Sequence, residues 1–179
     1  MKRILDAKEL AGAISRMVDD LAAVCPPDLP WAVVGIRTRG VALAERLKAR
    51  LAEKTGRDMP LGWLDITLYR DDLHEMEASP LVRQTKIDFD PTGMCVILVD
   101  DVLFTGRTIR AALGALSDYG RPKVVKLAVL IDRGHRELPI AADVVGCRIE
   151  TRRDEVVEVS VSETDDGDEV ISRPAEQDR

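Results

Sequence analysis

Apolar residues recur along this chain at helical spacing in three places. The pattern predicts amphipathic helices over residues 7–23, 41–54 and 108–119. Asp6 is followed three residues later by Glu9, which is the arrangement of a capping box, in which each side chain accepts a hydrogen bond from the other residue's backbone. The first helix is therefore expected to begin directly after Asp6.

Short apolar runs between these helices predict strands. WAVVGI at 31–36 and KLAVLI at 126–131 fit buried strands, and MCVILV at 94–99 is typical of a central parallel strand that is covered on both faces. Residues 62–69 and 155–161 alternate between apolar and polar side chains, as strands with one exposed face do. Strands that alternate with helices predict an α/β fold with a mostly parallel central sheet flanked by helices.

Two segments show no sustained period. Residues 70–90 are rich in charge and predict a long loop or a flap that moves over a site. Residues 163–179 hold seven acidic and two basic residues, so we expect a frayed acidic tail there. Residues 1–162 are then a single domain of nearly balanced charge.

Composition narrows the class of protein. A chain of 179 residues with 45% hydrophobic and 32% charged residues fits one soluble globular domain. No apolar run approaches the roughly 20 residues of a membrane span, and charges in the first ten residues interrupt any signal-peptide core, so we expect a cytoplasmic protein without a membrane partner. Three scattered cysteines and two histidines do not favour a zinc site or a disulfide framework. The net charge of -6 argues against nucleic-acid binding by the whole surface, although a local basic face would still allow it.

Candidate ligand residues gather in three loops. Ligands of parallel sheets bind beyond the carboxyl ends of the strands. The segments that follow three predicted strands, 37–40, 100–108 and 132–136, are therefore expected at one edge of the sheet. All three contain arginine, and in all three an arginine stands next to a glycine.

The turn Thr105-Gly106-Arg107-Thr108 has the parts of a phosphate site. It offers backbone N–H groups at a helix N-terminus, two hydroxyls and a guanidinium. The helix end itself favours an anion by about 0.3–1 kcal/mol.

Asp100 and Asp101 precede that turn, and their carboxylates would repel a phosphate. Acceptor-only groups there suit sugar hydroxyls, or Mg²⁺ held directly or through water or substrate. The alternative is that the pair only caps the helix, which is the commoner role of two adjacent aspartates. An apolar strand before the pair and Thr-Gly-Arg-Thr after it favour the ligand role, and a sugar phosphate satisfies both halves.

The segment Arg37-Thr38-Arg39-Gly40 offers two cations and a glycine that lets backbone approach closely. It is not a Walker A loop, because Val41 stands where that motif requires lysine. By itself it fits a solvated turn equally well. At the same sheet edge as the phosphate turn it would form a second anion site, which describes a substrate with phosphates at both ends.

The stretch VILVDDVLFTGRTI resembles the 5-phosphoribosyl-1-diphosphate (PRPP) signature of type I phosphoribosyltransferases. Further blocks resemble one branch of that superfamily, the bifunctional pyrimidine-operon regulators that are also uracil phosphoribosyltransferases. These blocks run in order through most of the chain: GIRTRG at 35–40, DITLYRDDL at 65–73, VILVDDVLFTGRTIRAAL at 96–113 and LAVLIDRGHRELPI at 127–140.

The resemblance implies the reaction of uracil with PRPP to give UMP and diphosphate, with Mg²⁺ as cofactor and a homodimer or higher homo-oligomer as the assembly. It implies that Asp100 and Asp101 hold the ribose hydroxyls and the metal, that Thr105–Thr108 hold the 5'-phosphate, and that Arg39, Asp100 and Asp101 are the catalytic residues. The full set of substrate-binding residues that it implies is Thr38, Arg39, Arg70, Asp100, Asp101, Val102, Leu103, Phe104, Thr105, Gly106, Arg107, Thr108, Arg133 and Val157. Within that set Thr38 faces the diphosphate, Arg70 lies on the flap, Arg133 borders the nucleotide and Val157 lines the base pocket.

The same branch binds messenger RNA when UMP is bound and thereby attenuates transcription of the pyrimidine operon. Ser15, Arg16, Arg152 and Arg153 are the candidate RNA contacts, with Arg148 near the last two. A solvated charged face explains these residues equally well, and TRRDE at 151–155 departs from the usual pattern of the branch. The alternative function is therefore a phosphoribosyltransferase for another base, without RNA binding.

Overall fold

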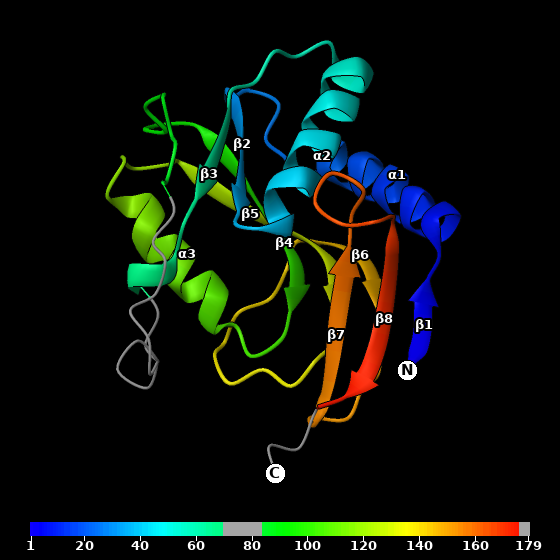
Figure 1. Cartoon of the computed structure of the whole chain (residues 1–179). Helices are drawn as coiled ribbons and strands as arrows, with labels where there is room; N and C mark the ends of the chain where they lie inside the picture. Colours follow the sequence, from blue (N-terminus) through cyan, green and yellow to red (C-terminus); the bar gives the residue numbers. More distant parts are fainter. Residues whose placement is uncertain (70–83, 176–179) are drawn as a thin grey trace.

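The computed structural model describes residues 1–69 and 84–175 (Figure 1). Arg70 and most of the predicted flap lie outside the described residues. The elements in chain order are β1 (Lys2–Leu5), α1 (Ala7–Val24), β2 (Trp31–Ile36), α2 (Arg39–Thr55), β3 (Leu61–Leu64), the 3-10 helix η1 (Thr67–Tyr69), β4 (Cys95–Leu103), α3 (Arg107–Ser117), β5 (Val124–Asp132), β6 (Val144–Arg148), β7 (Glu155–Ser160) and β8 (Glu169–Pro174).

Five strands form a parallel sheet in the order β3-β2-β4-β5-β6, which confirms the predicted α/β fold. The strand predicted to be central, β4, lies in the middle of this order. Its side chains alternate between two hydrophobic cores: Ile97 packs with α1 and α2 on one face, and Leu98 packs with α3 on the other. Burial on both faces explains why β4 reads as a continuous apolar run.

The helices begin and end close to the predicted positions. The capping box is present, because Glu9 N donates to Asp6 Oδ1 at 2.9 Å and Asp6 N donates to Glu9 Oε2 at 2.9 Å. The second helix starts at Arg39, two residues earlier than predicted, so Arg39 lies in its first turn. Among the described residues, every helix is too short or too polar to cross a bilayer.

A smaller antiparallel sheet, β1-β8-β7, stands beside the carboxyl ends of the parallel strands (Figure 1). The prediction of a frayed tail from Glu163 is wrong as far as Pro174, because β8 pairs with β7 and with the unpredicted strand β1. Val170 of β8 is fully buried in the same core as α1. β1 and β8 pair although Lys2 and Ser172 lie 170 residues apart, so local sequence does not reveal the pairing. This pairing orders a charged segment that has no apolar pattern of its own.

Two boundaries differ in ways that affect the site. The central strand extends to Leu103, so the two aspartates lie within β4 rather than in a loop. The strand predicted over 62–69 ends at Leu64 and gives way to η1. Lys86, just after the undescribed segment, pairs with Trp63 of β3 through backbone hydrogen bonds of 2.8 and 2.9 Å, which ties that part of the chain to the sheet edge.

Candidate active site

A cavity of about 420 Å³ opens at the carboxyl ends of β2 and β4. It is strongly polar, and it collects residues from two of the three predicted loops together with the segment after β3. The residues that line it are Arg37, Thr38, Arg39, Asp65, Ile66, Thr67, Asp100, Asp101, Val102 and Thr108. The structure therefore brings Thr38, Arg39, Asp100, Asp101, Val102 and Thr108 together as predicted.

The two carboxylates of the cavity have different surroundings. Asp100 is only 5% exposed, and its Oδ1 accepts a hydrogen bond of 3.0 Å from the N–H of Asp101. Burial, followed by the charge of Asp101, raises the pKa of Asp100 well above its usual value. Asp101 is half-buried, and its Oδ1 accepts from the N–H of Val102 at 2.8 Å. A cation or a pair of hydroxyl donors in the cavity would stabilise the ionised form of Asp100.

Gly40 brings the basic loop against these acids. A Cβ on Gly40 would stand 2.7 Å from the carbonyl oxygen of Val99 and 3.3 Å from Cα of Asp100. Only a residue without a side chain allows the first turn of α2 to approach β4 this closely. The preceding peptide, between Arg37 and Thr38, is cis. The loop thus places two arginines on the wall of a cavity whose other charged groups are carboxylates.

Arg37 is the less expected of those arginines. Its Nε is buried and has no hydrogen-bond partner among the described residues. Its guanidinium lies 5.7 Å from the ring centroid of Trp63, whose other cationic neighbour is Lys86 at 5.3 Å. A buried donor without a partner is costly in a protein interior, so a ligand atom in the cavity would be a favourable acceptor.

Arg39 is paired with Asp165, which lies in the turn between β7 and β8. Nε donates to Oδ2 at 3.3 Å and Nη2 donates to Oδ1 at 3.1 Å. The hydrogen bond from Val161 N, followed by those from Arg39 and Thr164, lowers the pKa of Asp165. The predicted diphosphate contact is therefore held by a residue of the segment that was expected to be frayed.

The predicted phosphate turn forms the N-terminus of α3. Gly106 has φ 95° and precedes the first helical residue, a conformation that glycine adopts at little cost. Glu137, in the loop after β5, makes two hydrogen bonds to this turn. Its N–H donates to Thr105 O at 2.9 Å, and its Oε2 accepts from Arg107 Nε at 2.9 Å. Free N–H groups at the start of a helix suit an anion, and Thr108 of this turn lines the cavity.

Arg133 and Val157 lie outside the lining of the cavity. Arg133 is 5% exposed and stacks on Phe104, with its guanidinium 4.1 Å from the ring centroid. It donates to the carbonyl oxygen of Arg152 at 2.9 Å, and burial lowers its pKa. Val157, in β7, packs against the larger hydrophobic core. Contact of these two residues with a nucleotide stays a prediction.

A profile of the phosphoribosyl transferase domain matches residues 2–165. A bifunctional protein PyrR from Thermus aquaticus is 52% identical over 167 residues, covering 93% of this chain and 92% of the relative. A second, from Chloroflexus aurantiacus, is 52% identical over 170 residues, covering 95% of this chain and 93% of the relative. The chain belongs to the phosphoribosyltransferase family, in the branch of the bifunctional PyrR proteins. It is therefore a pentosyltransferase.

Solved phosphoribosyltransferases share the fold. A hypoxanthine-guanine phosphoribosyltransferase from Bacillus anthracis superposes with a TM-score of 0.68 at 15% identity over 98% of both chains. A hypoxanthine phosphoribosyltransferase from Trypanosoma cruzi superposes with a TM-score of 0.66 at 18% identity, again over 98% of both chains. At these identities the likeness concerns the fold alone.

The sequence did not predict three of the residues that line the cavity: Asp65, Ile66 and Thr67. Arg37 belongs to the predicted basic segment 37–40, although it is absent from the set of substrate-binding residues that the resemblance implies. Asp65 opens the block DITLYRDDL, and that block was the one signal that pointed to the other three. In the structure Asp65 Oδ1 accepts from the N–H of Thr67 at 2.9 Å, which shapes the part of the cavity wall between β3 and η1.

The candidate RNA contacts fall into two groups. On α1, Ser15 Oγ accepts from Arg50 Nη1 at 2.8 Å, and Arg16 Nη2 donates to Gly146 O at 3.4 Å. On the segment between β6 and β7, Arg152 pairs with Asp154 at 2.7 Å and Arg153 pairs with Glu137. Within the described residues, no hydrogen bond or ion pair joins the two groups, so a shared RNA surface stays a prediction.

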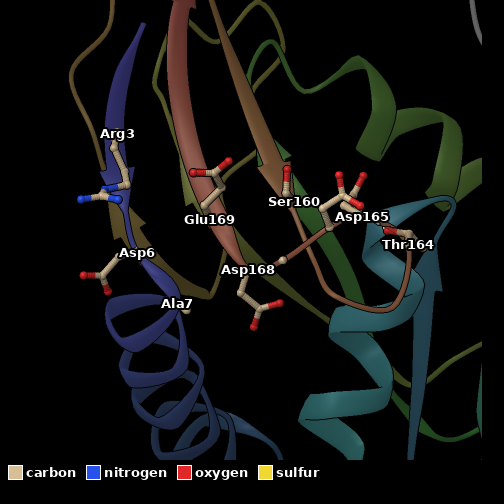
Figure 2. Close-up of a pocket in the computed structure, with 10 residues that line it drawn as sticks. Arg3, Asp6, Ala7, Ser160, Thr164, Asp165, Asp168 and Glu169 are labelled. Atoms are coloured by element: carbon tan, nitrogen blue, oxygen red, sulfur yellow. Dashed lines mark hydrogen bonds between the residues drawn. The ribbon is translucent and has the colours of Figure 1, made fainter.

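A larger cavity of about 810 Å³ lies between the start of α1 and the turn 161–168 (Figure 2). Carboxylates dominate its lining, and Figure 2 shows Asp6, Asp165, Asp168 and Glu169 around it. Among the described residues that line it, Arg3 alone is basic. Like charge makes it unsuitable for a phosphorylated substrate. Within the described part of the chain, no group of three or more His, Cys, Asp or Glu side chains is placed to hold a metal ion.

Proposed function

We propose that this phosphoribosyltransferase transfers the 5-phosphoribosyl group of PRPP to uracil, forming UMP and diphosphate. The observation that carries the proposal is the cavity in which Arg37, Thr38 and Arg39 face Asp100 and Asp101. The turn that begins α3 adds an anion site beside them. The spacing suits a substrate with a phosphate at one end, a diphosphate at the other and hydroxyls between.

The two aspartates bind the ribose. Their oxygens accept hydrogen bonds from the 2- and 3-hydroxyls, which lie between the two anionic ends of PRPP. The buried carboxylate of Asp100 gains most from such donors, because burial penalises its charged form. N–H groups of the turn 105–108 bind the 5'-phosphate and fix the ribose at its other end.

Catalysis in this site is electrostatic. As the bond between C1 and the diphosphate oxygen lengthens, positive charge grows on the ribose and negative charge grows on the leaving group. Arg39 and the loop that contains it stabilise the departing diphosphate, and Asp100 and Asp101 lie on the side of the ribosyl cation. Uracil nitrogen then bonds to C1, and its proton is released.

Mg²⁺ fits the residues present. Mg²⁺ is commonly held by one or two carboxylates together with substrate phosphates and water, and the cavity offers two carboxylates rather than a complete protein cage. Asp100 and Asp101 would hold the ion directly or through water or substrate oxygens. When bound, Mg²⁺ supplies charge neutralisation for the diphosphate.

We further propose that the protein binds the leader RNA of a pyrimidine operon when UMP is bound, and acts there as a homodimer or higher homo-oligomer. The name and similarity of the PyrR relatives support this second role. Arg16 and Arg152 are exposed cations that could contact phosphates. Both roles belong in the cytoplasm, where PRPP and nascent transcripts occur.

The test of the proposed reaction is the variant Arg39→Ala, assayed for PRPP-dependent UMP formation. Loss of a group that stabilises the leaving diphosphate is expected to lower kcat by about 100-fold, as removal of one transition-state donor does in other enzymes. Circular dichroism should show an unchanged fold, since Arg39 is half-exposed at a helix start. Undiminished UMP formation by the folded variant would contradict the assignment.

A phosphoribosyltransferase for another base is the second candidate. Discrimination among uracil, hypoxanthine and orotate depends in part on hydrogen bonds to the edge of the base. The solved hypoxanthine enzymes share the fold at 15–18% identity, whereas the PyrR relatives share about half of the sequence. The higher identity favours uracil.

A further inference from the structure

The turn between β7 and β8 holds the guanidinium of Arg39. Asp165 accepts from two adjacent nitrogens of that guanidinium, Nε at 3.3 Å and Nη2 at 3.1 Å. Such a side-on pair fixes the plane of the guanidinium as well as its position. Residues 39 and 165 are 126 positions apart in the chain, so this contact joins the small antiparallel sheet to the substrate cavity.

Asp165 is itself held firmly. Its Oδ2 accepts from the N–H of Val161 at 3.0 Å and from the hydroxyl of Thr164 at 2.9 Å. Figure 2 shows Thr164 and Asp165 on the loop that follows β7, beside the start of α2. The same turn is fastened to α2 a second time, because Arg46 donates to Asp168 at 2.6 and 2.8 Å. A carboxylate on such a rigid support is suited to orienting another side chain.

The pairing leaves part of the guanidinium available. A guanidinium carries five N–H donors, and Asp165 engages one on Nε and one on Nη2. Both donors on Nη1 and the second on Nη2 make no hydrogen bond to any described residue. Arg39 lines the substrate cavity, and its side chain is 42% exposed, so this outer edge is open to a ligand.

We propose that Asp165 is a positioning residue of the transferase reaction, which orients Arg39 so that its outer edge meets the leaving diphosphate. This inference rests on the proposed function. An unrestrained arginine must lose rotamer freedom when it binds an anion, and an arginine already held by Asp165 has lost that freedom on folding. Asp165 does not compete with the diphosphate, because the two carboxylate oxygens occupy the opposite edge of the guanidinium.

The variant Asp165→Asn keeps the shape of the side chain and removes its charge. We expect a roughly ten-fold loss of kcat/KM for PRPP, in the range that small misplacements of catalytic groups cause, with an unchanged KM for uracil. Asp166→Asn is the matched control, because Asp166 is the exposed neighbouring carboxylate and makes no hydrogen bond or ion pair with another described residue. It should behave as the wild type.

A double-mutant cycle separates positioning from a structural effect on the turn. If Asp165 acts through Arg39, then Asp165→Asn costs nothing further in kcat/KM once Arg39→Ala is present. An equal loss in both backgrounds would show that the substitution only loosens the turn, and it would overturn the inference. Faster turnover in Asp165→Asn would also overturn it, because a competing carboxylate gives that result.

Calorimetric binding of inorganic diphosphate with Mg²⁺ distinguishes this inference from the proposed function. Weaker diphosphate binding by Asp165→Asn than by Asp166→Asn supports the positioning role. That result would hold even if the wild type did not convert uracil, and only the assignment of uracil as the base would then be wrong. An active wild type with equal diphosphate binding and equal turnover in both variants overturns positioning alone. A wild type that neither binds diphosphate nor forms any nucleotide overturns both.

Discussion

Gly40 of α2 lies against the backbone of Asp100 in β4, with room for hydrogen alone between them. A Cβ at position 40 would come within 2.7 Å of Val99 O and 3.3 Å of Asp100 Cα, and both are backbone atoms that cannot move aside cheaply. This contact sets the distance between the basic loop and the acidic pair. The absence of a side chain at position 40 therefore lets the two halves of the site, which carry opposite charge, approach each other closely.

Gly40→Ala should consequently damage both the fold and the site. We expect a loss of about 1–3 kcal/mol in the free energy of unfolding, as in other overpacked positions, and a raised KM for PRPP. Urea denaturation and steady-state kinetics measure the two effects. Gly12→Ala is the control, because the nearest atom to its new Cβ would be a side-chain atom at 3.7 Å, and alanine in the middle of α1 should stabilise the helix.

Arg37→Met should weaken PRPP binding and leave stability nearly unchanged. The buried Nε of Arg37 has no partner among the described residues, so methionine removes an uncompensated donor while it keeps the apolar stem. We expect the KM for PRPP to rise by about ten-fold, as for loss of one hydrogen bond to a charged group. An unchanged KM would mean that Arg37 does not contact the substrate.

Arg57→Met provides a matched comparison for that variant. Arg57 also stacks on a tryptophan, Trp31, at 4.5 Å, but its guanidinium donates to Leu29 O at 3.1 Å and lies outside the cavity lining. Its replacement should lower the melting temperature and leave the KM for PRPP unchanged. The same substitution is thus expected to change the KM for PRPP at position 37 and the melting temperature at position 57.

The pair of Arg46 and Asp168 should make stability depend on pH in the acid range. Hydrogen bonds from Arg46 lower the pKa of Asp168 from its ordinary 3.8 to about 2. Because the folded state depresses this pKa, the contribution is present above pH 4, where it is about 2 kcal/mol, and it disappears as the pH falls toward 2. Denaturant unfolding of the wild type and Asp168→Asn should show a difference that shrinks between pH 5 and 2.5. A difference independent of pH would exclude the ion pair as its cause.

Arg16→Ala tests the proposed RNA surface. Loss of one phosphate contact should weaken binding of a pyrimidine-operon leader RNA, and should reduce the slope of log affinity against log salt by about 1. Arg121→Ala is the control, because Arg121 is an exposed arginine in the turn before β5 and has no assigned role. Equal salt slopes for both variants and the wild type would remove Arg16 from the interface.

The local sequence predicted the parts of the fold that local patterns determine. Residues 31–36 form β2 as predicted, and the capping box of Asp6 and Glu9 is present, because each depends on neighbouring residues. The two strands β1 and β8 escaped prediction because they stabilise one another across nearly the whole chain. Their charged residues give no apolar period long enough to recognise.

The sequence predicted some of the residues of the site but not their contacts with distant segments. Thr38, Arg39 and the two aspartates of β4 could be placed in one cavity, because parallel strands end at a common edge. The pairing of Asp165 with Arg39 could not be predicted, because the sequence of an acidic segment does not identify which of the 26 basic residues pairs with a given carboxylate. In the structure Arg39 and Arg46 pair with Glu163, Asp165 and Asp168, so the turn that contains these acids is held against α2 rather than solvated.

In the function that we propose, phosphoribose passes from PRPP to uracil in the cavity beside Asp100 and Asp101. The most direct measurement is an assay of the purified protein with PRPP, Mg²⁺ and each of uracil, hypoxanthine, guanine and orotate, with nucleotide products separated by chromatography. We expect UMP from uracil and, under the same conditions, far less nucleotide from any other base. Efficient IMP, GMP or OMP formation without UMP would contradict it.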